Sequence, residues 1–486
     1  MSPAAEPSDA AIRPAVVVRA GPHRRPELEW VCDVLLRRRL GLEPRFEVGP
    51  PDRVEIDTGA GIVAWTDDFL SRADAEWLGA ARAGSLVASE AACWPVHDAG
   101  LVERLGGTEL LQLFGDGQWR QQPGLTWLPI DITGSSFFVL SRYEEACREA
   151  PVDRHGRFPA AAAALVRAGW SQRPCVDEWL VLLAWALAPL LPGWEPPATA
   201  PEVWVTADVD LPYSPGVASP MRAARQAAAH LLRERRPLTA AAAALNPLAT
   251  RLGFTGLDPY ETFDWMMDAN EAAGQRITFF FICTVQATEY EGFYRIDEPR
   301  IAALMRRIVG RGHGVGLHAS YASVEEPERL PAERRRLLDA MADAGAAPAG
   351  TASLGSRQHY LRWRADRTPA LLDAAGFAFD ASLGHAERPG FRCGTCHEYP
   401  LFDLAGRRAL SIVERPLVAM DASVLSPSYL GLGPGEAARG LLQSLKATCR
   451  RFGGTFSLLW HNSMLVDGAE RRLYRELLVP YGGAKA

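Results

Sequence analysis

No stretch of this sequence is apolar for long enough to cross a lipid bilayer. The longest apolar run, Trp179–Trp194, falls short of the roughly 20 residues that a membrane-spanning helix needs, and prolines interrupt it. It is typical of a helix in a protein core. The first residues, Met1–Pro26, are rich in Ala, Pro and Arg and lack the charged-then-apolar order of a secretion signal. We therefore expect a cytoplasmic protein without membrane insertion, with a mobile tail over residues 1–27.

A strong excess of either charge is also missing. The formal net charge of −6 is small for 486 residues, which argues against a nucleic-acid partner or an anionic membrane surface. The eight cysteines are scattered, so we expect no framework of structural disulfides in a chain of this size. Cys393 and Cys396 have the spacing of metal ligands, but without a second pair they favour a packed turn or a substrate loop over a zinc site.

No internal repeat divides the chain, but one segment breaks all regular structure. Pro192–Pro201 contains four prolines and a glycine, and it is the strongest candidate for a domain boundary. We expect a mixed α/β domain over residues 28–195, in which no chemical motif is evident, and a second domain over residues 196–486. The length of the chain agrees with two or three domains.

The stretch Val203–Asp210 carries the clearest chemical signal. It is an apolar run of β-forming residues that ends in Asp208 and Asp210, and prolines follow it. Such a run predicts a buried strand of an α/β protein, and catalytic groups in these folds lie at the carboxyl ends of strands. One aspartate could bind a metal while the other acts as a base. The alternative is an ordinary turn, because Asp and Pro also favour turns.

Further apolar strands are expected at 277–282, 314–318, 377–380 and 456–461, and three of these end in a histidine or an aspartate. Six of the ten histidines lie between His313 and His461. The repeated strand–helix order predicts a mainly parallel sheet or barrel. One rim of it would then carry Asp208, Asp210, His318, Asp380 and His461. Residues 221–245, rich in Ala and Arg, predict one or two inserted surface helices, or alternatively a flexible lid.

Taken in order, these motifs resemble those of the polysaccharide deacetylase (NodB homology) superfamily, which comprises carbohydrate esterase family four and its relatives. Thr206-Ala207-Asp208-Val209-Asp210 is similar to the first family motif, and Gly312–His318 is similar to the glycine-rich approach to the second. Arg357-Gln358-His359-Tyr360 resembles an Arg-Pro-Tyr motif with His in place of Pro, and Leu459-Trp460-His461 resembles a Leu-x-His motif. The resemblance covers roughly the last three-fifths of the chain.

This resemblance implies an α/β fold: a distorted (β/α) barrel of the deacetylase type, preceded by a smaller mixed α/β N-terminal domain. It also implies a divalent metal, most often zinc, in an Asp-His-His site. By the match, Asp208 would be the general base, and Asp210 and His318 would be metal ligands. The second metal histidine of the family is missing, because Ala322 stands where it is expected. His359 could supply the third ligand instead.

The same resemblance assigns the remaining roles. His461 would be the general acid, with Asp380 steadying it, and Arg357 would orient the base through a charge-assisted pair. Asn462, next to His461, and Tyr360, in the third motif, could contact a carbohydrate or N-acyl substrate. Separately, Arg392, beside Cys393 and Cys396, could bind an acidic or hydroxylated sugar or be an ordinary surface arginine.

We therefore expect a metal-dependent hydrolase that removes an N-acetyl or other N-acyl group from a sugar or polysaccharide precursor. Two alternatives stay open. One is a catalytically degenerate carbohydrate-binding or assembly protein, which the missing histidine favours. The other is a hydrolase of a different carbon–nitrogen bond, such as that of a cyclic amide. Segments upstream, Ser141–Glu145 and Asp153–Pro159, are similar to a bacterial subgroup in which an uncharacterised domain precedes the deacetylase-like one.

Overall fold

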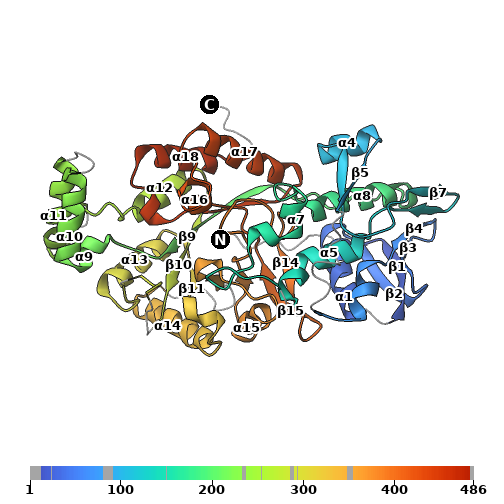
Figure 1. The fold of residues 1–486 in the computed structure, drawn as a ribbon, viewed down its shortest axis with the longest axis horizontal. Helices are drawn as coiled ribbons and strands as arrows, with labels where there is room; N and C mark the ends of the chain where they lie inside the picture. The colour runs from blue at the N-terminus through green and yellow to red at the C-terminus, as the bar shows by residue number, and fades with distance from the viewer. Residues whose placement is uncertain are drawn as a thin grey trace.

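The computed structural model describes residues 13–22, 25–79, 91–148, 150–232, 237–252, 254, 256–284, 289–292, 294–346 and 354–481. The first part of the chain builds a mixed six-stranded sheet of order β2-β1-β3-β4-β8-β7 (blue to cyan in Figure 1). Its strands are β1 (Ala15–Ala20), β2 (Glu43–Val48), β3 (Arg53–Asp57), β4 (Ile62–Thr66), β7 (Arg120–Gln122) and β8 (Leu125–Trp127). A two-stranded ribbon is formed by β5 (Ala92–Pro95) and β6 (Glu109–Gln112).

Strand β1 lies inside the segment that the sequence predicted to be a tail. Val16 and Val18 on this strand are buried, and the strand pairs with β2 on one side and β3 on the other. The predicted tail over residues 1–27 is therefore wrong for β1 and for the start of helix α1 at Arg25. Burial alternates along Ala15–Ala20, as it does in a strand with one face in the core. Residues 1–12, 23 and 24 lie outside the described residues.

The helices in this first part of the chain pack mainly on one another. They are α1 (Arg25–Cys32), the π-helix η2 (Asp33–Arg39), α2 (Phe69–Asp74), α4 (Ala99–Leu105), α5 (Ile132–Leu140), α6 (Tyr143–Ala146), η4 (Ala160–Ala162), α7 (Ala164–Arg167), α8 (Cys175–Leu187) and η5 (Ala188–Leu190). The proline-rich segment Pro192–Pro201 then runs without regular structure to the next strand.

The second part of the chain forms a curled nine-stranded sheet of order β14-β15-β13-β12-β11-β10-β9-β17-β16. Every neighbouring pair in it is parallel except β14 and β15. The strands are β9 (Glu202–Val209), β10 (Ile277–Ile282), β11 (Gly314–Ala319), β12 (Gly355–Gln358), β13 (Phe379–Asp380), β14 (Tyr399–Asp403), β15 (Arg408–Glu414), β16 (Ala419–Met420) and β17 (Thr455–Leu459). This confirms the α/β class and the mainly parallel sheet, which is a half-barrel with β14 and β16 at its two ends.

The central strands are built for burial on both faces. All residues of β10 except Thr278 are buried, as its continuous apolar sequence predicts for a strand inside a parallel sheet. Its neighbour β11 carries Gly314 and Gly316, which allow the two strands to approach closely. A Cβ added at Gly316 would lie 2.6 Å from the Phe280 ring, and one at Gly314 would lie 2.7 Å from Thr278 Oγ1. Side chains at these positions would therefore push β10 and β11 apart.

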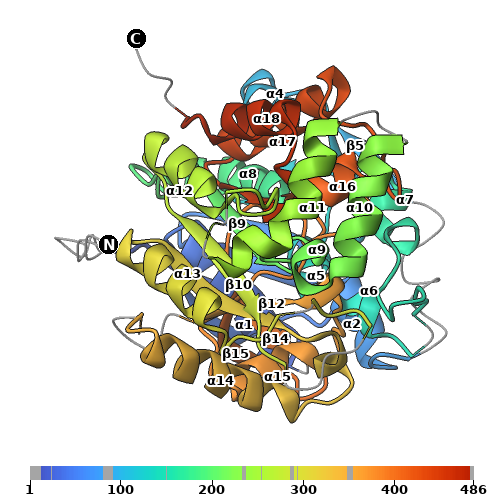
Figure 2. The same ribbon diagram turned by 90° about the vertical axis from the view of Figure 1, so that its left-hand side faces the viewer.

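Helices surround the outer face of this curled sheet: in Figure 2, α13, α14 and α15 lie along one side of the half-barrel, and α17 and α18 lie along the opposite side. The helices are α12 (Phe263–Ala272), α13 (Pro299–Gly310), η6 (Tyr321–Val324), α14 (Arg329–Asp343), η8 (His359–Leu361), α15 (Thr368–Ala374), α16 (Asp421–Leu425), α17 (Glu436–Arg451), η9 (Asn462–Met464) and α18 (Gly468–Leu478). The inserted segment forms α9 (Pro215–Ala218), α10 (Pro220–Leu232) and α11 (Pro237–Arg251). Helices α10 and α11 pack on each other and stand away from the body at the left of Figure 1, which confirms the predicted surface helices.

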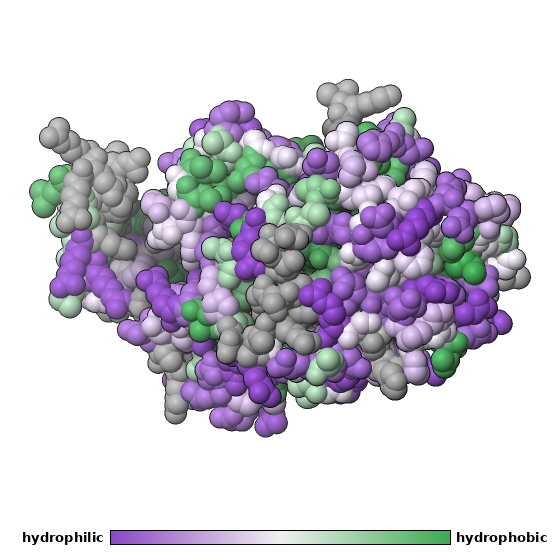
Figure 3. Space-filling model, turned by 45° about the vertical axis from the view of Figure 1, so that its right-hand side comes forward, coloured by the Kyte–Doolittle hydropathy of each residue, from purple (hydrophilic) through white to green (hydrophobic). Residues whose placement is uncertain are grey.

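The two sheets share one continuous hydrophobic core. Side chains from Val16 to Leu478 belong to the same buried cluster, and the Trp30 indole donates to the backbone carbonyl of Pro400 at 3.1 Å. Hydrophilic residues cover most of the face seen in Figure 3. Among the described residues, no helix is both long and apolar enough to cross a membrane. The boundary between residues 195 and 196 stays a prediction.

Candidate metal and catalytic site

Five chemically active side chains meet at the carboxyl edge of the nine-stranded sheet. Asp208 and Asp210 lie at the end of β9, His318 near the end of β11, His359 directly after β12, and His461 shortly after β17. Because these strands are parallel, their carboxyl ends open on the same edge. Residues separated by up to 253 positions in the sequence, as Asp208 and His461 are, therefore become neighbours.

Asp210, His318 and His359 form a group that could hold a metal ion. Their ligand atoms all lie within 4.8 Å of one another, with Asp210 Oδ1 at 3.2 Å from His318 Nε2 and 3.5 Å from His359 Nε2. Asp210 Oδ1 is buried and has no hydrogen-bond partner among the described residues. A buried carboxylate oxygen without a partner is costly unless a cation or donor occupies the space that it faces. The donor set of one carboxylate and two imidazoles suits zinc.

Both histidines direct Nε2 toward the Asp210 carboxylate. The Nδ1 of His318 lies 3.0 Å from the carbonyl oxygen of Arg357, and a proton on Nδ1 would leave the Nε2 lone pair facing Asp210. Burial lowers the pKa of His359 to about 4, so this side chain is neutral at neutral pH. Neutral imidazole is the form that binds metals. The residues present therefore fit a divalent metal.

The base predicted at Asp208 lies beside this group and not in it. Its Oδ2 is 3.6 Å from His318 Nε2, and its Oδ1 is 3.2 Å from Arg357 Nε. The Arg357 side chain is completely buried, donates to Thr206 Oγ1 at 2.8 Å and lies over the Phe280 ring. An arginine held on three sides in this way fixes the carboxylate with which it pairs.

His461 lies between Asp210 of the candidate metal group and Asp421. Its Nε2 lies 3.6 Å from Asp210 Oδ2, and its Nδ1 lies 2.8 Å from Asp421 Oδ1. The second oxygen of Asp421 accepts the backbone N–H of His461 at 2.7 Å. Burial by itself lowers the pKa of His461, but the Asp421 carboxylate and then Asp210 outweigh it and raise the pKa to about 10. His461 is therefore held as a proton donor.

The prediction that Asp380 steadies His461 is wrong, because Asp421 does so. The Asp380 carboxylate accepts the N–H and hydroxyl of Ser382, and it lies opposite Glu414 in the sheet register. Burial raises the pKa of Asp380 to about 6. Asp421 could have been found in the sequence as the acidic residue that follows the apolar run Leu417–Met420, but β16 has only two residues.

Two predicted substrate residues serve the fold instead. The Arg392 guanidinium is buried, pairs with Glu145 at 3.0 and 2.6 Å and donates to the Gly384 carbonyl. The buried Asn462 side chain donates to the carbonyl oxygens of Leu211 and Tyr260 at 2.9 Å each. Both predictions are wrong, because loop residues next to a motif were assumed to face the substrate. Their polar groups in fact connect loops to each other.

A cavity of about 350 Å³ opens over the site. Its walls include Asp208, Asp210, His318, His359 and His461, together with three tyrosines and Arg157. The tyrosines are Tyr290, Tyr360 and Tyr429. Tyr360 lines the cavity, and aromatic rings can stack on apolar faces of sugars, but its contact with a substrate stays a prediction. Arg157, which comes from the first part of the chain, was missed because no local pattern links it to the motifs.

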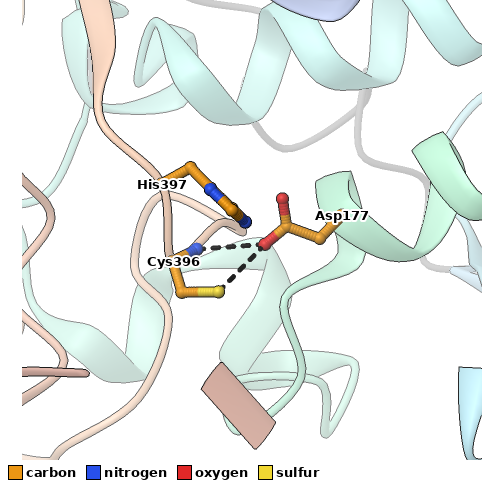
Figure 4. A group of neighbouring side chains, drawn as sticks. All are labelled: Asp177, Cys396 and His397. Atoms are coloured by element: carbon orange, nitrogen blue, oxygen red, sulfur yellow. Dashed lines mark hydrogen bonds between the residues drawn. The ribbon is translucent and has the colours of Figure 1, made fainter. Parts of the chain in front are cut away.

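A second group with ligand-like atoms consists of Asp177, Cys396 and His397 (Figure 4). Its carboxylate is already saturated: Asp177 Oδ1 accepts from Thr395 and Arg39, and Oδ2 accepts the N–H and thiol of Cys396. Arg39 Nη1 lies 2.8 Å from Asp177 Oδ1, and its positive charge disfavours a metal cation at the same carboxylate. This group joins helix α8 to the Cys393–His397 loop, which agrees with the packed turn favoured by the sequence.

The Asp421–His461 pair gives a testable pH dependence. His461 carries a raised pKa, so it keeps its proton until the pH approaches that value and loses the ability to donate above it. Replacing Asp421 by Asn removes the neighbouring charge that raises the pKa most. We expect Asp421→Asn to shift the alkaline limb of the kcat profile to lower pH and to lower kcat roughly 10-fold or more. An unchanged alkaline limb, measured on metal-loaded protein with a substrate that it hydrolyses, would contradict the role of Asp421.

The fold and the site together define an α/β protein with a candidate metal site at the carboxyl edge of a parallel sheet. Residues 17–192 match the model of a protein family of unknown function, DUF7033. A crystal structure from Mycobacterium smegmatis, of a protein assigned as a polysaccharide deacetylase, is similar at 19% identity with a TM-score of 0.36. That match covers 59% of this chain and 85% of the other, and a superposition this loose carries no argument about family or activity. No curated protein matches the chain.

Proposed function

We propose that this protein is a metal-dependent hydrolase that removes an N-acetyl or other N-acyl group from a sugar or polysaccharide precursor. The observation that carries the proposal is the placement of a candidate Asp-His-His metal group between a carboxylate and a cationic histidine. Asp208 Oδ2 lies 3.6 Å from His318 Nε2, and His461 Nε2 lies 3.6 Å from Asp210 Oδ2. Amide hydrolysis needs these two proton-transferring groups on either side of the reacting carbonyl.

In this proposal each side chain has one task. Asp210, His318 and His359 would hold the metal, with zinc the expected ion. The chemistry that a divalent metal supplies when bound is Lewis acidity, which polarises the acyl carbonyl and makes water easier to deprotonate. Asp208 would take the proton from the attacking water, and Arg357 keeps Asp208 directed at it. His461 would donate its Nε2 proton to the leaving amine, and Asp421 keeps that proton on His461.

The first test is the metal content of the purified protein and of two variants, His318→Ala and His359→Ala. We expect near-stoichiometric zinc in the parent and a loss of metal affinity of at least about 10-fold in each variant, because each removes one of three ligands. His97→Ala, which alters an exposed histidine far from the site in the sequence, is the matched control and should retain the metal. Assays of acetate release from N-acetylated sugars and of ring opening of cyclic amides would follow.

Each outcome separates the proposal from its rivals. If only His318→Ala loses the metal, the third ligand is a residue other than His359. A parent that binds neither zinc nor cobalt after reconstitution would contradict the hydrolytic mechanism and leave a carbohydrate-binding protein as the better account. Ring opening of cyclic amides without acetate release from N-acetylated sugars would show that the protein hydrolyses the carbon–nitrogen bond of a cyclic amide instead.

A further inference from the structure

The turn that carries His359 has a strained backbone. Tyr360 and Leu361, the two residues after His359, both have left-handed backbone conformations, with φ values of 60° and 54°. Residues other than glycine pay of the order of 1–3 kcal/mol each for such conformations, and they keep them only where the surroundings hold them. The direction of the His359 side chain depends on this turn. What holds the turn therefore also determines whether His359 faces Asp210.

The contacts that hold it come from the first part of the chain. Arg157 Nη1 donates to the carbonyl oxygen of Tyr360 at 3.0 Å, and Arg362 Nε donates to the carbonyl oxygen of His155 at 2.7 Å. The His155 ring packs against the Tyr360 ring with centroids 4.9 Å apart. Two hydrogen bonds and a ring contact thus join the loop Asp153–Arg157 to a turn roughly 200 residues later in the chain.

The loop is itself held rigidly. The Asp153 carboxylate accepts the backbone N–H groups of His155 and Arg157 at 2.8 and 3.0 Å, and it pairs with Arg157 Nε at 2.8 Å. Gly156 supplies the positive φ that the turn requires. Only 8% of Arg157 is exposed. With Nε and Nη2 both engaged by Asp153, Nη1 is aimed in one direction, toward Tyr360.

The same loop also reaches the place where the family pattern expects the missing histidine. The Tyr321 hydroxyl lies 3.2 Å from His155 Nδ1, and the Tyr321 carbonyl accepts from Arg362. Ala322 follows directly, so its neighbourhood is connected to the loop and to the turn after His359. With His359 as the proposed third ligand, the metal site depends on whatever positions His359.

We propose that Arg157 is a positioning residue for the metal site, which it completes by holding the Tyr360 carbonyl and, through it, the His359 imidazole. The inference rests on the proposed function, because it requires a metal at Asp210, His318 and His359. It gives the segment 17–192, matched by a family of unknown function, a share in the site built by the rest of the chain. In this proposal Arg157 acts through His359, and it also lines the cavity over the site.

The test measures cobalt affinity and the visible spectrum of the cobalt-loaded full-length protein. Arg157→Met removes both the pair with Asp153 and the donor to Tyr360. We expect it to weaken cobalt binding about 10- to 100-fold, as loss of residues that support metal ligands does, and to change the spectrum. Arg157→Lys retains a charge near Asp153 but cannot reach all partners, so it should lose less. Arg148→Met, the same change at an exposed arginine, is the control and should bind as the parent does.

A double-mutant cycle distinguishes positioning from general damage. In a His359→Ala background, Arg157→Met should change cobalt affinity less than about two-fold, because the ligand that it positions is gone. An equal loss in both backgrounds, or parental affinity and spectrum in Arg157→Met, would overturn the proposal while the metal site stands. If Arg157→Met does not fold, the same double-mutant cycle is measured with Arg157→Lys. A parent that binds no cobalt would overturn the inference together with the proposed function.

Discussion

Replacing Asp208 by Asn is expected to abolish most of the activity and to leave the metal in place. Asparagine keeps the shape of the side chain but cannot accept a proton from water. General-base catalysis contributes about 10²- to 10⁴-fold to rates, so kcat should fall by that factor. Metal content should stay at the parental value, because the candidate ligands are Asp210, His318 and His359. The measurement is acetate release from the best N-acetylated substrate, with metal analysis of the same preparation.

The control for this change is Asp264→Asn, which alters a carboxylate whose side chain is 57% exposed. It should leave kcat and metal content unaltered. A kcat within a few-fold of the parent in Asp208→Asn would assign the base elsewhere. Loss of the metal together with activity would instead make Asp208 a ligand, and the separation of base and ligand between the two aspartates would be wrong.

The second large effect is expected on stability, from Arg392→Met. Arg392 and Glu145 form a buried bidentate pair, and Arg142 extends it by pairing with Glu145 and donating to the Arg392 carbonyl at 2.7 Å. Without Arg392, the buried Glu144 and Glu145 carboxylates share Arg142 alone, and removing one partner from a buried ion pair costs about 3–5 kcal/mol. The free energy of unfolding, followed in urea, should fall by that amount. Methionine fills similar space, so the loss reports on charge rather than on a cavity.

Arg408→Met gives the matched comparison, because Arg408 pairs with Asp403 at 3.3 Å with a side chain that is 58% exposed. A surface pair of this kind contributes about 0–1 kcal/mol. If Arg392→Met costs no more than Arg408→Met, the buried network does not hold the loop to helix α6. Activity per folded, metal-loaded molecule should be unchanged in Arg392→Met, whereas a substrate-binding arginine would raise KM.

The residues at the rim of the site could be predicted from local sequence patterns because each of them lies at the end of a strand. Val203–Asp210, Gly314–His318 and Phe456–His461 are apolar runs that each finish on a potential ligand, base or acid. A parallel sheet brings all such ends to one edge, whichever strands are neighbours. The sequence therefore led to Asp208, Asp210, His318 and His461 without knowledge of the strand order. His359 followed from its place in a motif, and the structure brings it to the same group.

The residues that the sequence missed or misplaced depend on contacts between distant segments. Asp421 meets His461 because β16 pairs with β17 at the end of the sheet, and a two-residue strand leaves no periodic signal. Asp380 ends a strand as predicted, but β13 lies on the far side of β12 from the site. Arg392 and Asn462 are polar residues in loops, and only the packed structure shows which way such side chains point.

The sequence by itself determined the α/β class, the parallel strands and the edge at which polar side chains collect, because hydrophobic periodicity and strand direction are local properties of the chain. Only the tertiary structure decided that Asp421 holds His461 and that Arg392 forms a structural ion pair with Glu145. It also decided that the loop Asp153–Arg157 reaches the turn after His359. These are choices between partners far apart in the sequence. They are made by packing and by pairing of buried polar groups, which no local pattern encodes.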